Sequence, residues 1–229
     1  MSARVAGRAV ALLMALLPAF FVAPVPAHAQ VPPAAPAGTT PAGTQELFAA
    51  MAKEDGDAVG RLLKDKRLAN ARNADGEPLL YVAAERGNAE LVRAVIDAGG
   101  DANGRTANGE TALHAAGMQG SAAVTALLLA KGANPELANR DGERALYWAA
   151  ATGTLEVVKL LLDKGVDLNV QDARGNTALH GAADGGHAAV VKLFIAKKAN
   201  LLIRNRAGLL LVELARAREH KDVEAELLK

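Results

Sequence analysis

The chain has 229 residues, of which 26 are Lys or Arg and 25 are Asp or Glu, so its formal net charge is +1 at pH 7. A balance this close to neutral gives no indication of nucleic acid or an anionic membrane as a partner. The chain contains no cysteine, which excludes the small secreted domains held together by disulfides and any thiolate metal site.

The first 29 residues have the three parts of a secretory signal peptide. MSARVAGR carries two arginines and no acid, AVALLMALLPAFFVA is a continuous apolar run, and small residues precede Ala29. The run is about 15 residues, whereas a membrane-spanning helix needs about 20; an uncleaved membrane anchor is the alternative interpretation. The sequence therefore predicts cleavage after Ala29 and export to a bacterial periplasm.

Residues 30–43, QVPPAAPAGTTPAG, are rich in proline and alanine and include one large apolar residue, Val31. A segment of this composition cannot bury enough apolar surface to offset the entropy of ordering it. We expect it to be a flexible linker, with the structured part of the chain beginning near Thr44.

Glycines recur along the chain at an interval of 33 residues without an insertion. Each period contains a short alanine-rich segment, such as TALHAAGMQG, and then a longer one, such as LEVVKLLLDKGV, in which apolar residues recur every three or four positions. This spacing is typical of amphipathic helices, so each period predicts two helices. The two glycine series are Gly43, Gly76, Gly109, Gly142, Gly175 and Gly208, and Gly99, Gly132 and Gly165.

The shorter series, Gly99, Gly132 and Gly165, lies just past the second predicted helix of each period. A left-handed helix cap at this position favours a residue without a β-carbon. The fourth period has Lys198 there instead. A non-glycine residue in that conformation costs on the order of 1 kcal/mol, so the fourth period is expected to fray more readily than the others.

The chain resembles the ankyrin repeat family over residues 44–229. The resemblance rests on the 33-residue period, the two TALH segments, the alanine pairs and the segments KGANPEL and KGVDLNV. It implies an all-α solenoid in which each repeat is a β-turn followed by two antiparallel helices. Pro78 and Arg144 replace the threonine of TALH, so two helices lack a hydroxyl cap worth about 1 kcal/mol. Full repeats are expected at 76–108, 109–141, 142–174 and 175–207, with capping repeats at 44–75 and 208–229.

His114 and His180 occupy the same position in two repeats, whose equivalents in two others are Tyr81 and Tyr147. No cysteine, HExxH or His-x-x-His pattern accompanies them. The resemblance implies that this histidine hydrogen-bonds to the adjacent turn, and we interpret both as scaffold residues. A metal-binding or enzymatic role for them is the alternative from another class of function.

Other catalytic patterns are absent from the sequence as well. It contains no GxSxG, no P-loop and no dinucleotide-binding glycine pattern. The sequence therefore predicts a protein that is not an enzyme and holds no cofactor or metal.

The resemblance implies that partners dock on a concave face formed by the turn tips and the exposed side of the first helices. Arginines recur at one turn position and glutamates at another. Rows of opposite charge fit a protein better than a polyanion, because the acidic row would repel phosphates; an ordinary solvated surface is the alternative. The predicted partner-binding residues are Arg72, Glu77, Arg105, Glu110, Met118, Arg140, Glu143, Tyr147, Trp148, Gln171, Arg174 and Arg204.

Trp148 is the single tryptophan, and its equivalents Val82, Ala115 and Gly181 are all smaller. Aromatic residues flanked by arginines are typical of interface hot spots, so the indole is a candidate anchor for a partner. The alternative is that it fills the space left by Gly181 and serves packing alone.

We therefore expect a monomeric, exported protein whose concave face binds another protein, with neither nucleic acid nor membrane as a partner. Resemblance to exported bacterial ankyrin proteins implies two roles. One is support of a periplasmic enzyme, including one that handles oxidative stress; the other is neutralisation, as an immunity protein, of a toxin delivered to the periplasm. Both roles stay open at this point.

Overall fold

A computed structural model describes residues 41–229 of the chain. The predicted signal peptide, residues 1–29, and residues 30–40 of the predicted linker lie outside the described part. Within residues 41–229 the structure is all-α, as expected: twelve α-helices and one 3-10 helix, with no strand.

The twelve α-helices are 7 to 9 residues long and follow one another in pairs. A short 3-10 helix, Lys66–Asn70, separates the first pair from the second. The pairs are α1 (Thr44–Ala52) and α2 (Gly56–Leu62), α3 (Leu79–Glu85) and α4 (Ala89–Asp97), α5 (Ala112–Gln119) and α6 (Ala122–Ala130), α7 (Ala145–Ala151) and α8 (Leu155–Leu162), α9 (Ala178–Asp184) and α10 (Ala188–Ala196), and α11 (Leu211–Ala217) and α12 (Lys221–Leu227).

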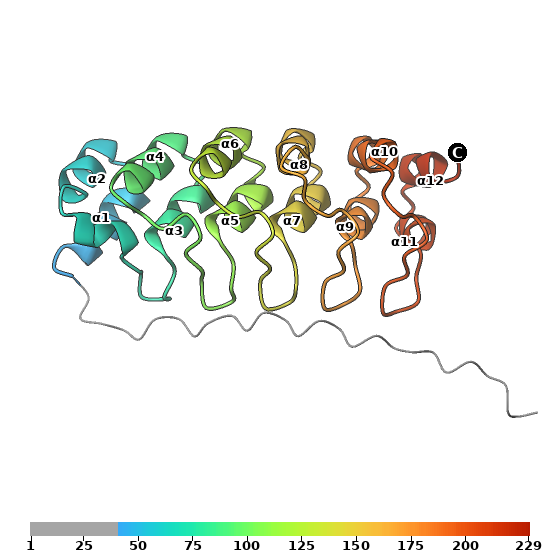
Figure 1. Ribbon diagram of the computed structural model, residues 1–229, viewed down its shortest axis with the longest axis horizontal. Helices are drawn as coiled ribbons and strands as arrows, with labels where there is room; N and C mark the ends of the chain where they lie inside the picture. Colours follow the sequence, from blue (N-terminus) through green and yellow to red (C-terminus); the bar gives the residue numbers. More distant parts are fainter. Residues whose placement is uncertain (1–40) are drawn as a thin grey trace, which may run out of the picture. The chain divides into compact units, whose positions relative to one another are not determined.

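Successive pairs stack in chain order and form two layers (Figure 1). The odd-numbered helices make one layer, the even-numbered helices make the other, and a hairpin projects from the odd layer before each of α3, α5, α7, α9 and α11. One continuous apolar core runs through the stack, with fully buried residues such as Leu79, Leu113 and Phe194. Because helices this short are marginal alone, burial against neighbouring pairs has to stabilise each of them.

Each hairpin is stabilised by one side chain that accepts hydrogen bonds from main-chain amides of the same hairpin. In the hairpin before α3, Asn73 Oδ1 accepts from the amides of Asp75 at 3.0 Å and Glu77 at 2.9 Å, and Gly76 has φ +78°. Short polar side chains commonly stabilise turns in this way. Asn139, Asp172 and Asn205 make the same pair of bonds in the hairpins before α7, α9 and α11.

The left-handed positions expected from the glycine series are confirmed. Gly99, Gly132 and Gly165 have φ of +97°, +85° and +75°, and Lys198 adopts the same conformation with φ +61°. Lys198 is exposed, so the lysine follows the fold of the repeat although its β-carbon makes that conformation unfavourable.

Replacing Lys198 with Gly is expected to raise the free energy of unfolding by about 1 kcal/mol, because the strain of a left-handed non-glycine residue disappears. Lys197→Gly is the matched control: Lys197 has φ −84°, so glycine there only adds backbone entropy to the unfolded chain and lowers stability. Urea denaturation of the three proteins measures the difference. A Lys198→Gly protein no more stable than the wild type would contradict the strain.

Candidate binding surface

His114 connects two repeats at the start of α5. Its Nδ1 accepts from the Thr111 amide at 3.1 Å and lies 2.9 Å from the Thr111 hydroxyl, while Nε2 lies 3.1 Å from the Glu143 carbonyl in the next hairpin. Nδ1 acts as the acceptor, so Nε2 carries the proton and donates to that carbonyl. The neutral ring therefore has both nitrogens in use and is 1% exposed.

His180 repeats half of this arrangement. Its Nδ1 accepts from the Thr177 amide at 3.1 Å, but its buried Nε2 makes no hydrogen bond of ordinary geometry. The carbonyls of Leu209 and Ile203 lie close enough to oppose the fall in its pKa that burial causes. The bonds of Nδ1 to the threonine at the start of each helix, together with burial, give both histidines a role in packing and capping. Within residues 41–229 no group of His, Asp or Glu has the arrangement of a metal site.

The pKa of His114 is lowered to about 4 from its ordinary 6.5, chiefly because burial penalises the charged ring. The unfolded chain therefore takes up a proton below pH 6.5 that the folded chain accepts only near pH 4. The contribution of this histidine to the free energy of unfolding is therefore full above pH 6.5 and falls as the pH falls toward 4. At 1.36 kcal/mol per pKa unit the loss is about 3 kcal/mol.

Urea denaturation of the wild type and His114→Gln at pH 7 and pH 4 measures this loss. The wild type is expected to lose about 3 kcal/mol more than the variant over this range, because glutamine does not titrate. Equal losses in the two proteins would show that His114 is not buried in its neutral form.

The predicted arginine row serves largely to connect the hairpins. Arg72 Nη1 donates to the carbonyl of Arg105 at 2.8 Å, Arg105 in turn donates to the carbonyl of Ala138, and Gln171 Nε2 donates to the carbonyl of Arg204 at 3.1 Å. Each donor and acceptor are 33 residues apart. We call these inter-hairpin hydrogen bonds, and they leave less of the row available to a partner than the sequence suggests.

The three glutamates of the predicted acidic row, Glu77, Glu110 and Glu143, differ in burial. Glu143 is 2% exposed; its carboxylate pairs with Arg174 Nη2 at 2.6 Å and accepts from Asn139 Nδ2 at 3.0 Å. The Glu143 carboxylate is thus occupied by contacts within the protein. Arg174, by contrast, keeps 66% of its side chain exposed.

Glu77 and Glu110 are partly exposed. Glu77 accepts from Asn73 Nδ2 at 2.7 Å, and Glu110 accepts from the Tyr81 hydroxyl at 3.3 Å. Burial raises the pKa of Glu110, and the neighbouring Glu143 and Glu77 carboxylates add to this effect. Burial and the Glu110, Glu85 and Glu77 charges together raise the pKa of Tyr81. These two glutamates lie in the hairpins just before α3 and α5.

Trp148 and Tyr147 form an edge-to-face pair at the start of α7, with ring centroids 5.8 Å apart at 87°. Both side chains are half-buried, and the buried Trp148 Nε1 has no hydrogen-bond acceptor. The space at Gly181 is occupied by Tyr147: a β-carbon there would lie 3.3 Å from Tyr147 Cε2. The packing role that the sequence suggested for Trp148 at Gly181 thus belongs to Tyr147.

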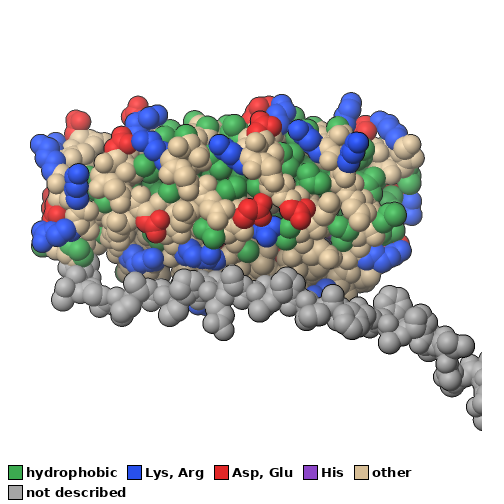
Figure 2. All heavy atoms as spheres, viewed as in Figure 1, with side chains coloured by type: hydrophobic (Ala, Val, Ile, Leu, Met, Phe, Trp, Pro, Cys, Tyr) green, Lys and Arg blue, Asp and Glu red, His purple; other side chains and the backbone are tan. Residues whose placement is uncertain are grey.

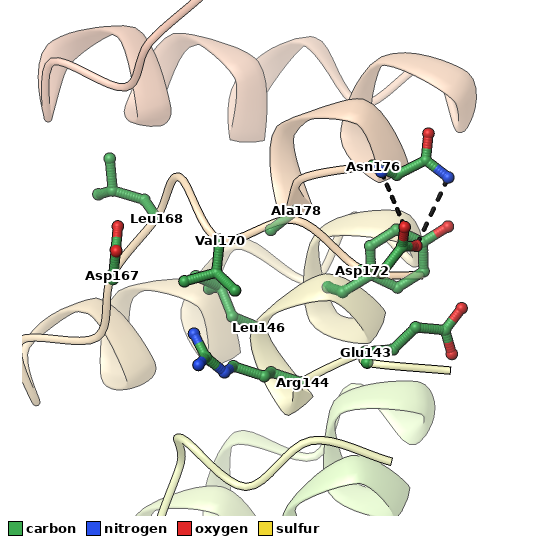
Figure 3. A pocket seen from close by; sticks show the side chains of 11 residues that line it. Glu143, Arg144, Leu146, Asp167, Leu168, Val170, Asp172, Asn176 and Ala178 are labelled. Carbon is green, nitrogen blue, oxygen red and sulfur yellow. Dashed lines mark hydrogen bonds between the residues drawn. The ribbon is translucent and has the colours of Figure 1, made fainter. Parts of the chain in front are cut away.

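A small solvent-open notch, with a cavity volume of about 20 Å³, lies between the start of α7 and the hairpin before α9 (Figure 3). Leu146, Val170 and Ala178 belong to its apolar lining, and Glu143 and Asp172 to its acidic lining. Ligand pockets are usually larger and enclose most of their ligand. The notch is therefore better described as a gap between two hairpins than as a small-molecule site.

The remaining predicted residues lie at the surface. Met118 on α5 is 39% exposed and belongs to the helix that packs against α7, which carries Tyr147 and Trp148. The structure thus brings Met118, Tyr147 and Trp148 onto adjacent first helices, whereas Arg72 and Arg204 lie in the first and last hairpins. The other exposed members are Arg140, Gln171, Arg174 and Arg204.

Sequence reasoning overlooked a second series of bridging side chains. Asn103 Oδ1 accepts from the Asn134 amide at 2.8 Å, and Asn169 Oδ1 accepts from the Asn200 amide at 2.8 Å. Asn70, Glu136 and Leu202 occupy equivalent positions, and Leu202 is 79% exposed. The sequence held a signal for this series: asparagines recur in one register of the 33-residue period, and leucine replaces them in the last repeat.

Helix pairs stacked in two layers, with hairpins on one side, define a helical repeat protein. A family model described as ankyrin repeats (3 copies) matches residues 47–139 and 118–205. The chain belongs to the ankyrin repeat family, whose repeats generally mediate protein–protein interaction. A search of curated proteins finds no match. Among residues 41–229, no helix combines the length and apolar character needed to cross a bilayer.

Proposed function

We propose that this chain is an exported, non-enzymatic protein that binds another protein through the first helices and hairpins of its central repeats. The proposed anchor is the aromatic surface, which we define as Met118, Tyr147 and Trp148. Export to the periplasm rests on residues 1–29, whose pattern is that of a cleavable signal peptide.

The observation that carries the proposal is the incomplete burial of the aromatic pair on α7. Tyr147 and Trp148 are half-buried, so part of each ring faces solvent. Exposed aromatic and methionine side chains together are typical of interfaces. The exposed parts of the two rings and of Met118 are therefore available for contact with a partner.

The surrounding charge favours a protein as the partner. Figure 2 shows acidic and basic side chains interspersed with apolar ones on the visible face. Nucleic acid would require a continuous basic surface to neutralise its phosphates. A protein can meet both signs of charge and gains specificity from doing so.

Capture of a partner from periplasmic extract, followed by titration of the purified complex, tests the aromatic surface. Trp148→Ala is expected to weaken binding by at least about 2 kcal/mol, roughly 30-fold, as is usual for an anchoring tryptophan. Leu228→Ala is the matched control, because Leu228 is apolar and 65% exposed but lies after α12. Binding by the Trp148→Ala protein at the affinity of the control would remove the aromatic surface from the site.

Export has its own test. Mass spectrometry of the protein recovered from the periplasmic fraction is expected to show a mature chain that begins at Gln30, with a net charge of −1, since cleavage removes Arg4 and Arg8. An intact chain that begins at Met1 and remains in the cytosol would contradict export while leaving the binding surface untouched.

A further inference from the structure

We propose that the junction between the α7–α8 pair and the α9–α10 pair is a hinge in the stack, held closed by the Glu143–Arg174 ion pair. This inference goes beyond the proposed function, since it concerns how the stack bends and does not depend on which protein it binds. Three features of the junction support it: a missing inter-hairpin hydrogen bond, uneven contact between the two helix layers, and an ion pair at a position where other junctions have none.

The first feature is the absence of an inter-hairpin donor. Arg72, Arg105 and Gln171 each donate to a carbonyl in the following hairpin. The residue of this register in the hairpin before α7 is Ala138, which has no side-chain donor to reach the carbonyl of Gln171. The solvent-open notch lies between the same two hairpins (Figure 3).

The second feature is the contrast between the two helix layers. In the first layer α7 and α9 make the most extensive contact of any neighbouring pair, whereas α8 and α10 make the sparsest contact in the second layer. Glycines allow the close approach: a β-carbon at Gly181 would lie 3.2 Å from Ala151 Cβ, and one at Gly185 would lie 2.8 Å from the Ala151 carbonyl. Hence α7 and α9 form the pivot, and the second helices beside it, α8 and α10, are less firmly joined.

Two further bonds cross this junction, one at the end of α7 and one between the two hairpins. His187 Nε2 lies 2.8 Å from the Ala151 carbonyl, and the Ala173 amide donates to the Asp141 carbonyl at 2.7 Å. They keep the two repeats in register while the junction bends.

The third feature is the ion pair itself. Glu143 and Arg174 lie in the hairpins on the two sides of the junction, 2.6 Å apart, and the carboxylate is buried while the arginine is largely exposed. The equivalent positions at the other junctions hold no pair of opposite charge: they are Glu77 with Asn108, Glu110 with Asp141, and Asn176 with Ala207. An ion pair thus joins the two hairpins at the one described junction whose inter-hairpin hydrogen bond is missing.

The layered arrangement fixes the direction of movement. The first helices lie between the hairpins and the second helices (Figure 1). When the ion pair breaks, the hairpins before α7 and α9 separate about the α7–α9 contact, and α8 and α10 move toward each other. Bending of this kind changes the surface beside Tyr147 and Trp148, which lie on α7 at the edge of the junction.

Pulsed dipolar spectroscopy on the full chain, with spin labels on two introduced cysteines, tests this movement. The chain has no native cysteine, and residues 93, 126, 159 and 192 are exposed positions of one register on α4, α6, α8 and α10. Labels on Lys159→Cys and Lys192→Cys report on the hinge, and labels on Arg93→Cys and Ala126→Cys are the matched control at another junction.

In Glu143→Gln the 159–192 distances are expected to shift to shorter values and to spread more widely, while the 93–126 distances stay the same. Arg174→Gln, which changes an exposed side chain, is expected to give the same shift. Adding Ala138→Arg to Glu143→Gln supplies the missing inter-hairpin donor and is expected to restore the wild-type distances.

Unchanged or longer 159–192 distances in Glu143→Gln and Arg174→Gln would overturn the hinge. Equal shifts in both label pairs would overturn it as well, because they would indicate loosening of the whole stack. Since no partner is present in the experiment, these outcomes are independent of whether the aromatic surface binds a protein.

Discussion

Every helix pair in the described part of the chain depends on its neighbours for burial. The helices are only 7 to 9 residues long, too short to be stable in water by themselves. Apolar contact between successive pairs provides the core, and side-chain bonds to main-chain groups of the next hairpin hold the pairs at a fixed offset. The 33-residue period follows from this constraint, because each bonding group has to recur at the same place in each unit.

The same constraint explains which side chains remain for function. His114 uses both ring nitrogens to join two repeats, and Glu143 is buried against Arg174. Neither has a free group poised for chemistry. The side chains left over include the apolar and aromatic ones on the first helices, where Tyr147 and Trp148 contact each other and Met118 is exposed. The proposed binding function therefore rests on the shape and composition of this surface.

The period, the two helices per repeat and the left-handed positions could be predicted from the sequence, because they depend on backbone conformation and on apolar spacing. Lys198 illustrates this: its place in the glycine series was enough to predict its conformation, and φ is +61°. The direction in which a side chain points was harder to predict from the sequence. Arg72 and Arg105 share a register, but a long flexible side chain can extend into solvent or bond to a neighbouring carbonyl, and only the packed structure distinguishes the two. The position of Tyr147 against Gly181 likewise depends on how closely α7 and α9 approach each other.

The dependence of each pair on its neighbours is tested most directly by circular dichroism and urea unfolding of a chain that lacks residues 142–174, one whole period. Removing a full period keeps the register of the remaining repeats, so His114 meets the carbonyl of Asn176 in place of that of Glu143. The account predicts a folded, helical protein that unfolds cooperatively, whereas a chain that lacks residues 142–158, about half a period, is unfolded. An unfolded chain after removal of the full period, or a folded one after removal of the half period, would contradict it.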